Sequence, residues 1–164
     1  MDYQLRKPRK EEYDLLFGIK KRAFSECVIE TWGAWDDEVQ HKFFQEDLGD
    51  SGFRVIELDG EVVGMVSFGK EKAVMKLYAL YIDPEMQGKG LGTKILQDLI
   101  QQAEKEPLVL KLQVLHCNIR AQKLYERVGF TNKGPGHDEH HYLMEYSNTS
   151  LGLFSDPQNL HNRG

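Results

Sequence analysis

The spacing of hydrophobic residues predicts two helices in the first third of the chain. Over residues 10–28, apolar side chains fall three or four positions apart with charged residues between them, which is typical of a helix with one buried face. Residues 31–37 interrupt this pattern, and Asp36 or Asp37 can then cap a second helix that runs to about Leu48. The side chains that this second helix is expected to bury are Val39, Phe43, Phe44 and Leu48.

Alternating and continuous apolar runs predict strands in most of the remaining chain. Asp59 and Gly60 form a strong hairpin turn between two of these strands. Two further helices are expected over residues 90–105 and 118–127, and Gly129 is a suitable C-cap for the second. The predicted strands cover residues 3–6, 53–58, 62–69, 74–82, 108–115, 130–133 and 140–146.

The order of these elements predicts an α+β fold. Strands come first in a run, and helices then alternate with strands, so we expect a mixed α/β sheet with helices on both faces. A length of 164 residues suits one domain, which we place over residues 1–146. Residues 147–164 read as a polar tail, and its apolar residues could dock on a second subunit or on their own, so a monomer and a homodimer both stay open. Those apolar residues include Leu151, Leu153 and Phe154.

Composition and charge exclude several classes of function. The net charge of −5 argues against nucleic-acid binding, which needs a basic surface, but it permits a cationic substrate. No stretch approaches the ~20 apolar residues of a membrane span, and the first residues lack the apolar core of a signal peptide. The two cysteines, Cys27 and Cys117, are too few for a disulfide scaffold and form no zinc-binding pair. We therefore expect free thiols, no metal and a cytoplasmic protein.

A glycine-rich turn between a strand and a helix carries the strongest chemical signal. Residues 87–92 read Gln-Gly-Lys-Gly-Leu-Gly. Free backbone N–H groups and the helix dipole make such a turn an anion site, its glycines let phosphate oxygens come close, and Lys89 adds charge at the rim. The spacing matches neither a P-loop nor a dinucleotide-binding fingerprint. The alternative is a helix start whose glycines serve only packing.

Two motifs in order resemble the GCN5-related N-acetyltransferase (GNAT) superfamily. The acyl-CoA-binding motif of that family has Gln or Arg, two residues, Gly, one residue, and Gly or Ala, which Gln87, Gly90 and Gly92 match. Residues 118–130 resemble the family's Asn-x-x-Ala-x-x-Leu-Tyr-x-x-x-Gly-Phe. The resemblance is close over residues 76–130, and it implies a mostly antiparallel, twisted sheet of about seven strands with a splayed parallel pair.

The resemblance also implies an acetyl-CoA site in the gap between the splayed strands. Backbone groups at the end of the first splayed strand would bind the pantetheine arm, and the glycine-rich turn would hold the pyrophosphate. Asn118 would contact the pantetheine or serve only as a helix N-cap. Tyr125 would protonate the departing thiolate as a general acid, or would only pack against the sheet. The cofactor contacts implied in this way are Leu80, Tyr81, Ile82, Gln87, Gly88, Lys89, Gly90, Leu91, Gly92, Asn118 and Tyr125.

The general base stays open. Some relatives carry a glutamate five residues before the asparagine of the second motif, but this chain has Gln113 there, which cannot take a proton. A water chain or another side chain could serve instead. His140 and His141 lie on the last predicted strand, on opposite faces, so one of them can point at the site. The candidate bases are Glu30, Asp36, Asp37, His140 and His141.

In this family the first two helices and their connection line the acceptor side. Here that connection carries Glu30, Trp32 and Trp35, and such aromatic and acidic side chains suit a cationic amine, or else they only pack beside a capped helix start. We expect an acetyl-CoA-dependent N-acetyltransferase that moves an acetyl group to a primary amine of a small molecule or peptide by direct attack in a ternary complex. The alternatives are a non-catalytic acyl-CoA-binding or regulatory module, and an acetyltransferase of protein N-termini or lysines.

Overall fold

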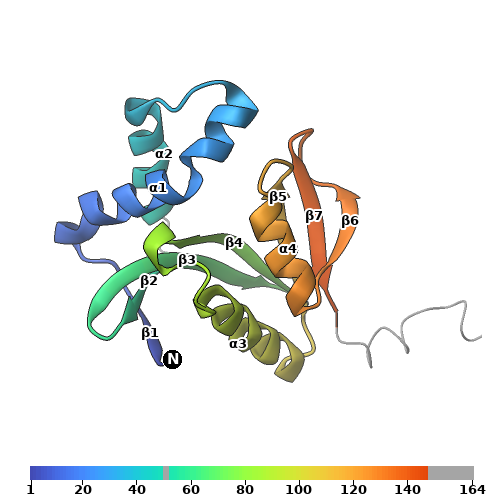
Figure 1. Ribbon diagram of the computed structural model, residues 1–164. Helices are drawn as coiled ribbons and strands as arrows, with labels where there is room; N and C mark the ends of the chain where they lie inside the picture. The colour runs from blue at the N-terminus through green and yellow to red at the C-terminus, as the bar shows by residue number, and fades with distance from the viewer. Residues whose placement is uncertain (50–51, 148–164) are drawn as a thin grey trace, which may run out of the picture.

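A seven-stranded sheet with helices on both faces forms the part of the chain described by the structure, a computed structural model covering residues 1–49 and 52–147 (Figure 1). The strands are β1 (Tyr3–Arg6), β2 (Phe53–Leu58), β3 (Glu61–Glu71), β4 (Val74–Ile82), β5 (Val109–Leu115), β6 (Thr131–Pro135) and β7 (His141–Tyr146). The α-helices are α1 (Tyr13–Trp32), α2 (Asp37–Gly49), α3 (Leu91–Lys105) and α4 (Ile119–Val128). Short 3-10 turns, η1 (Lys10–Glu12) and η2 (Pro84–Met86), precede α1 and α3. The predicted tail docking by Leu151, Leu153 and Phe154 falls outside the described residues.

The sheet confirms the predicted α+β class. Its strand order is β1-β2-β3-β4-β5-β7-β6, and all neighbours are antiparallel except β4 and β5, which are parallel. The parallel pair needs a crossover, which α3 provides on one face of the sheet. The one parallel step therefore brings the carboxyl end of β4, the start of α3 and the end of β5 to the same edge of the structure.

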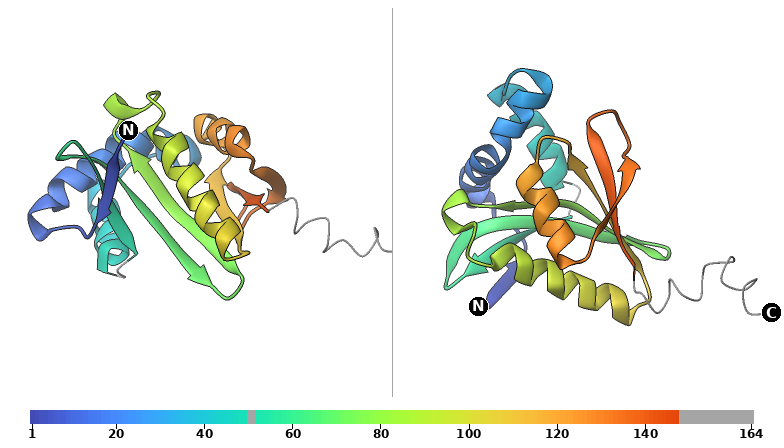
Figure 2. Two further views of the ribbon diagram at one scale, coloured as in Figure 1. Left: turned by 90° about the horizontal axis from the view of Figure 1, so that it is seen from below. Right: turned by 45° about the vertical axis from the view of Figure 1, so that its right-hand side comes forward.

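Two hydrophobic clusters attach the helices to opposite faces of the sheet. Alternate residues of β3 serve the two faces: Met65 belongs to the cluster under α1 and α2, and Val66 belongs to the cluster under α3 and α4. Figure 2 shows the same two helical layers on either side of the strands. Each fully buried side chain of this size stabilises the fold by about 1.5–3 kcal/mol, so both layers are firmly held.

The helices of the first layer differ from the prediction in two respects. α1 continues past residue 28 to Trp32, because the stop is the left-handed Gly33 (φ +90°) rather than the loss of periodicity. α2 buries Phe44, but Phe43 is 51% exposed and Val39 is also exposed. The expectation that all four apolar residues of α2 are buried is therefore wrong. α2 shares a face of the sheet with α1, and its one buried residue, Phe44, packs between the aromatic rings of Phe17 in α1 and Phe53 in β2.

None of the helices within residues 1–49 and 52–147 combines the length and the apolar composition that crossing a lipid bilayer requires.

Candidate functional site

The parallel strands β4 and β5 pair over only part of their length. The pairing joins Val74–Leu77 to residues 109–112. On its other edge, β4 pairs Leu77 with Phe68 of β3 and Ala79 with Ser67, so one extra residue of β4 forms a bulge at this point. A bulge increases the local twist of a strand, which turns the rest of β4 away from β5. This accounts for the predicted divergence of the parallel pair.

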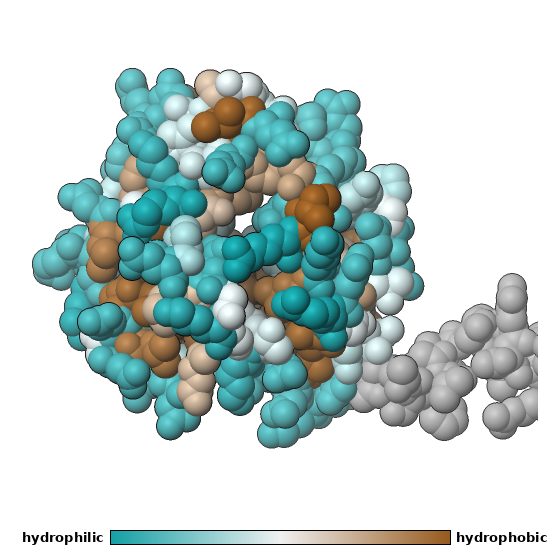
Figure 3. All heavy atoms as spheres, viewed as in Figure 1, coloured by the Kyte–Doolittle hydropathy of each residue, from teal (hydrophilic) through white to brown (hydrophobic). Residues whose placement is uncertain are grey.

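A cavity of about 950 Å³ follows the divergence. It is lined by the ends of β4 and β5, by the turn before α3, and by side chains of α1, α4 and the segment that connects β6 to β7. In Figure 3 the face seen in Figure 1 is hollowed near its middle, between α1 and α4. The predicted cofactor residues that line the cavity are Leu80, Tyr81, Ile82, Gln87, Gly88, Gly90, Gly92, Asn118 and Tyr125.

Two residues of the expected cofactor set lie elsewhere. Lys89 is exposed, and the side chain of Leu91, the first residue of α3, is buried in the hydrophobic core. Neither side chain lines this cavity within the described chain. The backbone N–H of Leu91 still belongs to the first turn of α3. Any contribution of these two residues to an anion therefore comes from backbone groups or from long-range charge.

The glycine-rich turn is shaped by its own backbone. Gly88 (φ +76°) and Gly90 (φ +89°) both adopt the left-handed conformation that disfavours other residues. Gly90 is the N-cap of α3 and has no side chain to satisfy the first N–H groups of the helix. Gln87 does not reach outward: its Nε2 donates to the carbonyl oxygen of Ile82 at 2.9 Å and ties the turn to β4. The turn thus presents unsatisfied N–H groups at a helix start, which suits an anion.

Gly92 has a packing role in the same turn. A Cβ at this position would lie 3.1 Å from Leu124 Cδ2 and 3.3 Å from Ile82 Cδ1. A side chain here would therefore crowd methyl groups of α4 and β4, which would have to give by a few tenths of an ångström. The two readings of the turn coexist, because Gly88 and Gly90 shape the backbone and Gly92 allows close packing.

Three basic residues of α4 also line the cavity, and the sequence analysis missed them. Arg120, Lys123 and Arg127 fall three and four positions apart, so they occupy one face of the helix. Arg120 Nη2 lies 3.5 Å from the position that a Cβ of Gly88 would take, beside the anion turn. The helical spacing of these positive charges was the signal that could have found them.

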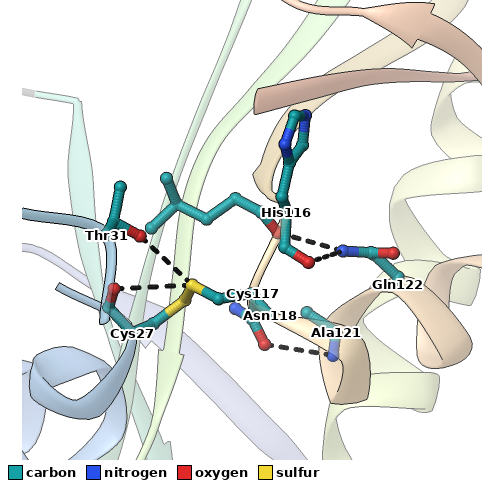
Figure 4. Close-up of a disulfide and its surroundings, with 8 residues drawn as sticks. Cys27, Thr31, His116, Cys117, Asn118, Ala121 and Gln122 are labelled. Carbon is teal, nitrogen blue, oxygen red and sulfur yellow. Dashed lines mark hydrogen bonds between the residues drawn. A yellow bond between two sulfur atoms is a disulfide. The ribbon is translucent and has the colours of Figure 1, made fainter. Parts of the chain in front are cut away.

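Asn118 lines the cavity and also caps α4. Its Oδ1 accepts a hydrogen bond from the backbone N–H of Ala121 at 3.2 Å (Figure 4). The amide nitrogen of the same side chain has its donor capacity left for a ligand. The capping role is therefore observed, and a ligand role for the remaining donor stays a proposal.

Tyr125 is 9% exposed and borders the cavity. Burial raises the pKa of its phenol to about 12, so the hydroxyl is protonated at neutral pH. The Tyr125 ring packs against the ring of Phe130 with a centroid distance of 5.7 Å, and this contact restrains the orientation of Tyr125. Tyr125 thus both packs against the core and lines the cavity, and its hydroxyl can serve as a hydrogen-bond or proton donor.

A disulfide joins Cys27 of α1 to Cys117 in the connection between β5 and α4 (Figure 4). The prediction of two free thiols is wrong, because the fold brings residues 90 positions apart in sequence to a Cα–Cα distance of 5.8 Å. Thr31 Oγ1 lies 3.3 Å from Cys117 Sγ. The bond fastens α1 directly beside Asn118, at the rim of the cavity.

Of the candidate bases, His141 alone lines the cavity within the described residues. Its side chain is 17% exposed, and its Nδ1 lies 2.6 Å from Asp138 Oδ1. The hydrogen bond from His141 is the main reason why the pKa of Asp138 falls to about 2, so this carboxyl is ionised at neutral pH. An ionised acceptor at Nδ1 favours the tautomer whose Nε2 carries a lone pair.

The other candidate bases do not line the cavity within the described residues, and three of them have structural partners. His140 is not on the last strand as predicted: it lies in the turn before β7, because its N–H is held by Asp138 Oδ1, and its ring packs edge-on against Trp32. Asp36 caps α2 by accepting from the Val39 N–H at 3.1 Å. Asp37 forms an ion pair with Lys21 at 2.9 Å. Glu30 is exposed on α1.

The predicted acceptor residues are not in the cavity wall. Trp32 is 53% exposed, and Trp35 packs against Phe17 and donates from Nε1 to Asp37. The part of α1 that lines the cavity is Ala23 and Phe24 instead. Gln113, at the position of the missing glutamate, lines the cavity and accepts from the backbone N–H of His137 at 3.0 Å. It holds the β6–β7 connection in place, and a carboxylate would meet the same N–H group.

Comparison with known proteins adds a family match and curated relatives. The sequence matches the acetyltransferase (GNAT) family over residues 16–130. An uncharacterised N-acetyltransferase of Archaeoglobus fulgidus is 34% identical over 82 residues, which cover 45% of this chain and 56% of that protein. The spermine/spermidine N(1)-acetyltransferase of Bacillus subtilis is 33% identical over 86 residues, which cover 46% of this chain and 57% of that protein. The chain thus spans about half the length of these curated relatives.

The same fold occurs in solved structures. The PaiA N-acetyltransferase of Thermoplasma acidophilum, in complex with coenzyme A, matches with a TM-score of 0.69 at 18% identity, over 90% of this chain and 100% of that one. At this identity the likeness concerns the fold alone.

Proposed function

Because the chain belongs to the GNAT family of acetyltransferases, we propose that it is an N-acetyltransferase (EC 2.3.1) that moves an acetyl group from acetyl-CoA to a primary amine of a small molecule or peptide. The observation that carries the proposal is one cavity that borders the glycine-rich turn, the buried phenol of Tyr125 and the imidazole of His141. These are an anion site, a proton donor and a proton acceptor, which together suit acyl transfer from a phosphate-bearing thioester.

Acetyl-CoA fits the residues present at the turn. The free N–H groups at the start of α3 and the left-handed Gly88 and Gly90 would receive the pyrophosphate, and Arg120 would add a bidentate cationic donor beside them. The unpaired edge of β4 beyond Leu77 offers backbone groups to the amides of the pantetheine arm. In this arrangement Lys123 and Arg127 neutralise the remaining phosphate charge.

Tyr125 acts as the general acid at the departing sulfur. A phenol with a pKa near 12 keeps its proton at neutral pH and donates it to the thiolate as the carbon–sulfur bond breaks. The phenolate that remains then takes a proton from solvent, which restores Tyr125 for the next turnover. The leaving group is neutral when it departs, which avoids a bare charge in the cavity.

His141 acts as the base toward the acceptor amine, and Asp138 is its positioning residue. Asp138 holds the Nδ1 proton of His141, so that Nε2 can take a proton from the attacking nitrogen. The amine attacks the thioester carbonyl directly, and the chain contributes mainly by holding both reactants in one cavity. The proton that His141 receives returns to solvent through the exposed β6–β7 connection.

An amine acceptor agrees with the charge of the chain and with its relatives. The net charge of −5 favours the approach of a cationic molecule. The Bacillus subtilis relative acts, by its name, on spermine and spermidine. We therefore rank polyamines and other small cationic amines first among acceptors, ahead of peptide N-termini and lysines.

A panel assay tests this function. Purified protein is incubated with acetyl-CoA and, in turn, polyamines, aminoglycosides, amino acids and short peptides, and the acetylated product is measured by mass spectrometry alongside release of free thiol. We expect product with at least one amine, and faster turnover for cationic amines than for neutral or acidic ones. Tight binding of acetyl-CoA without any acetylated product across the panel would instead support a non-catalytic binding module.

A further inference from the structure

Two side chains of the β6–β7 connection and one from the start of β7 form a compact cluster of nitrogen and oxygen ligands. His141 Nδ1 lies 2.6 Å from one oxygen of Asp138, and His137 Nε2 lies 3.4 Å from the other. One potential ligand atom from each of the three residues lies within 4.8 Å of the other two. The imidazole rings of His137 and His141 are 4.4 Å apart at a tilt of 33°, so both approach the carboxylate from neighbouring directions.

The cluster is held in position by backbone contacts. Gln113 Oε1 accepts from the N–H of His137 at 3.0 Å, and Asp138 Oδ1 accepts from the N–H of His140 at 2.8 Å. Gly136 donates its N–H to the carbonyl of His141 at 2.8 Å, which closes the turn. The three ligand residues therefore sit on a short segment whose backbone is held in place, which lowers the cost of ordering that segment around a ligand.

We propose that His137, Asp138 and His141 bind a borderline transition-metal ion, with Zn²⁺ as the reference case. Two imidazoles and one carboxylate form a three-residue ligand set that leaves positions for water or substrate. Ligand atoms of a tetrahedral Zn²⁺ site stand about 3.3 Å apart, given bonds of about 2.0–2.1 Å. The separations from the Asp138 oxygens, 2.6 Å to His141 and 3.4 Å to His137, lie on either side of that value, and all three ligand atoms lie within 4.8 Å of one another, so side-chain rotations would bring them to a common ion.

Such an ion would stop acetyl transfer, an effect that rests on the proposed function. In the metal-free chain Nδ1 of His141 faces Asp138 Oδ1, and the proposed mechanism uses Nε2 as the proton acceptor. An ion bound at Nδ1 takes that nitrogen's lone pair, and the single proton of the neutral imidazole must then reside on Nε2. His141 can no longer accept a proton from the amine. Since His137 and His141 both line the cavity, the ion would also add positive charge where a cationic acceptor approaches.

Metal binding is tested without reference to activity. Chelator-treated wild-type protein is titrated with ZnCl₂ in competition with a chromophoric chelator, and we expect one tightly bound ion per chain. His137→Gln should weaken binding by about tenfold or more, because it removes one of the three ligands. His140→Gln is the matched control: its ring packs against Trp32, outside the ligand cluster, and it should bind Zn²⁺ like the wild type. Equal affinity in wild type and His137→Gln would overturn the site.

Inhibition is tested second, on each variant relative to its own metal-free rate. Acetylated amine is measured by mass spectrometry, which avoids the affinity of Zn²⁺ for thiols. Zn²⁺ should inhibit the wild type and the His140→Gln variant at similar concentrations, a chelator should restore both, and His137→Gln should need about tenfold more Zn²⁺. Mg²⁺, which prefers oxygen ligands, should have no effect. Zinc binding that leaves the rate unchanged would overturn the inhibitory role. A chain that binds zinc but acetylates nothing would contradict the proposed function and leave the metal site standing.

Discussion

The end of the cavity where we propose that the cofactor binds, the cofactor end, is built mainly from backbone, whereas the opposite end, the proposed acceptor end, is built from side chains that distant segments contribute. At the cofactor end, Gly88 and Gly90 are left-handed and the first N–H groups of α3 face an anion site. At the opposite end, Phe24 comes from α1, and His141 comes from the last strand and depends on Asp138. Backbone sites require glycine at fixed spacing, and side-chain sites tolerate many solutions.

This difference explains why the sequence predicts a specific ligand for the cofactor end and no specific ligand for the acceptor end. A pyrophosphate is common to every CoA thioester, so one turn can serve all relatives of the family. Under the proposed function, the acceptor end must discriminate among amines, and only the few side chains that reach the cavity are placed to do so. The covalent link between the two ends is the disulfide that ties α1 to the residue before Asn118.

Removing this link should have the largest effect. The Cys27→Ser/Cys117→Ser double variant, or wild type under reductant, should lose about 4.5 kcal/mol of unfolding free energy, because the bond closes a loop with a sequence separation of 90 residues. Denaturant unfolding followed by circular dichroism measures the change. Since α1 carries cavity residues of the acceptor end, KM for the amine should rise more than KM for acetyl-CoA. Reductant should have no effect on the double variant. An unchanged unfolding midpoint of the reduced wild type would show that the disulfide does not hold the two ends together.

Replacing the phenol where the two ends meet should have the next largest effect. Tyr125→Phe should lower kcat by about 100-fold, equivalent to about 2.7 kcal/mol, because the departing thiolate loses its proton donor. KM for acetyl-CoA should change little, since the ring still packs against Phe130. Tyr146→Phe is a suitable control: its hydroxyl bonds to Glu104, away from the cavity lining, and turnover should be preserved. Steady-state kinetics decide the matter, and unchanged turnover of Tyr125→Phe would remove the acid role.

A change confined to the cofactor end should have the smallest effect. Arg120→Gln should raise KM for acetyl-CoA by about tenfold, or about 1.4 kcal/mol, and leave KM for the amine unaltered, because it removes one charged donor beside the glycine turn. Arg22→Gln, which breaks an exposed ion pair with Asp83 outside the cavity lining, is the charge-matched control and should be nearly silent. A rise in amine KM in Arg120→Gln would mean that the two ends are not separate.

The sequence predicted the fold and the glycine-rich turn beside the cavity because local rules decide both. Helix periodicity, the hairpin at Asp59 and Gly60 and the motif over residues 87–92 each depend on neighbours in the chain. The disulfide could not be predicted from neighbouring residues, because only the packing of α1 against the β5–α4 connection brings Cys27 and Cys117 together. The solvent exposure of Phe43 likewise depends on where α2 lies relative to α1.

The sequence contained a signal for part of the acceptor end, but the prediction did not use it. His137, Asp138 and His141 lie within five consecutive positions, and their proximity follows from the turn that joins β6 and β7. The prediction instead placed His140 and His141 on one strand and weighed each alone. Trp32 and Trp35 looked suited to a cation by composition, but their rings pack against His140 and Phe17 and do not line the cavity.

A crystal structure with acetyl-CoA is the most direct test of the central claim, that the gap between β4 and β5 is the acetyl-CoA site. We expect the pyrophosphate oxygens within hydrogen-bond distance of the backbone N–H groups of residues 88–92, the pantetheine arm along Leu80–Ile82, and the sulfur beside the hydroxyl of Tyr125. Acetyl-CoA bound elsewhere, with the gap between the two strands empty, would contradict the account.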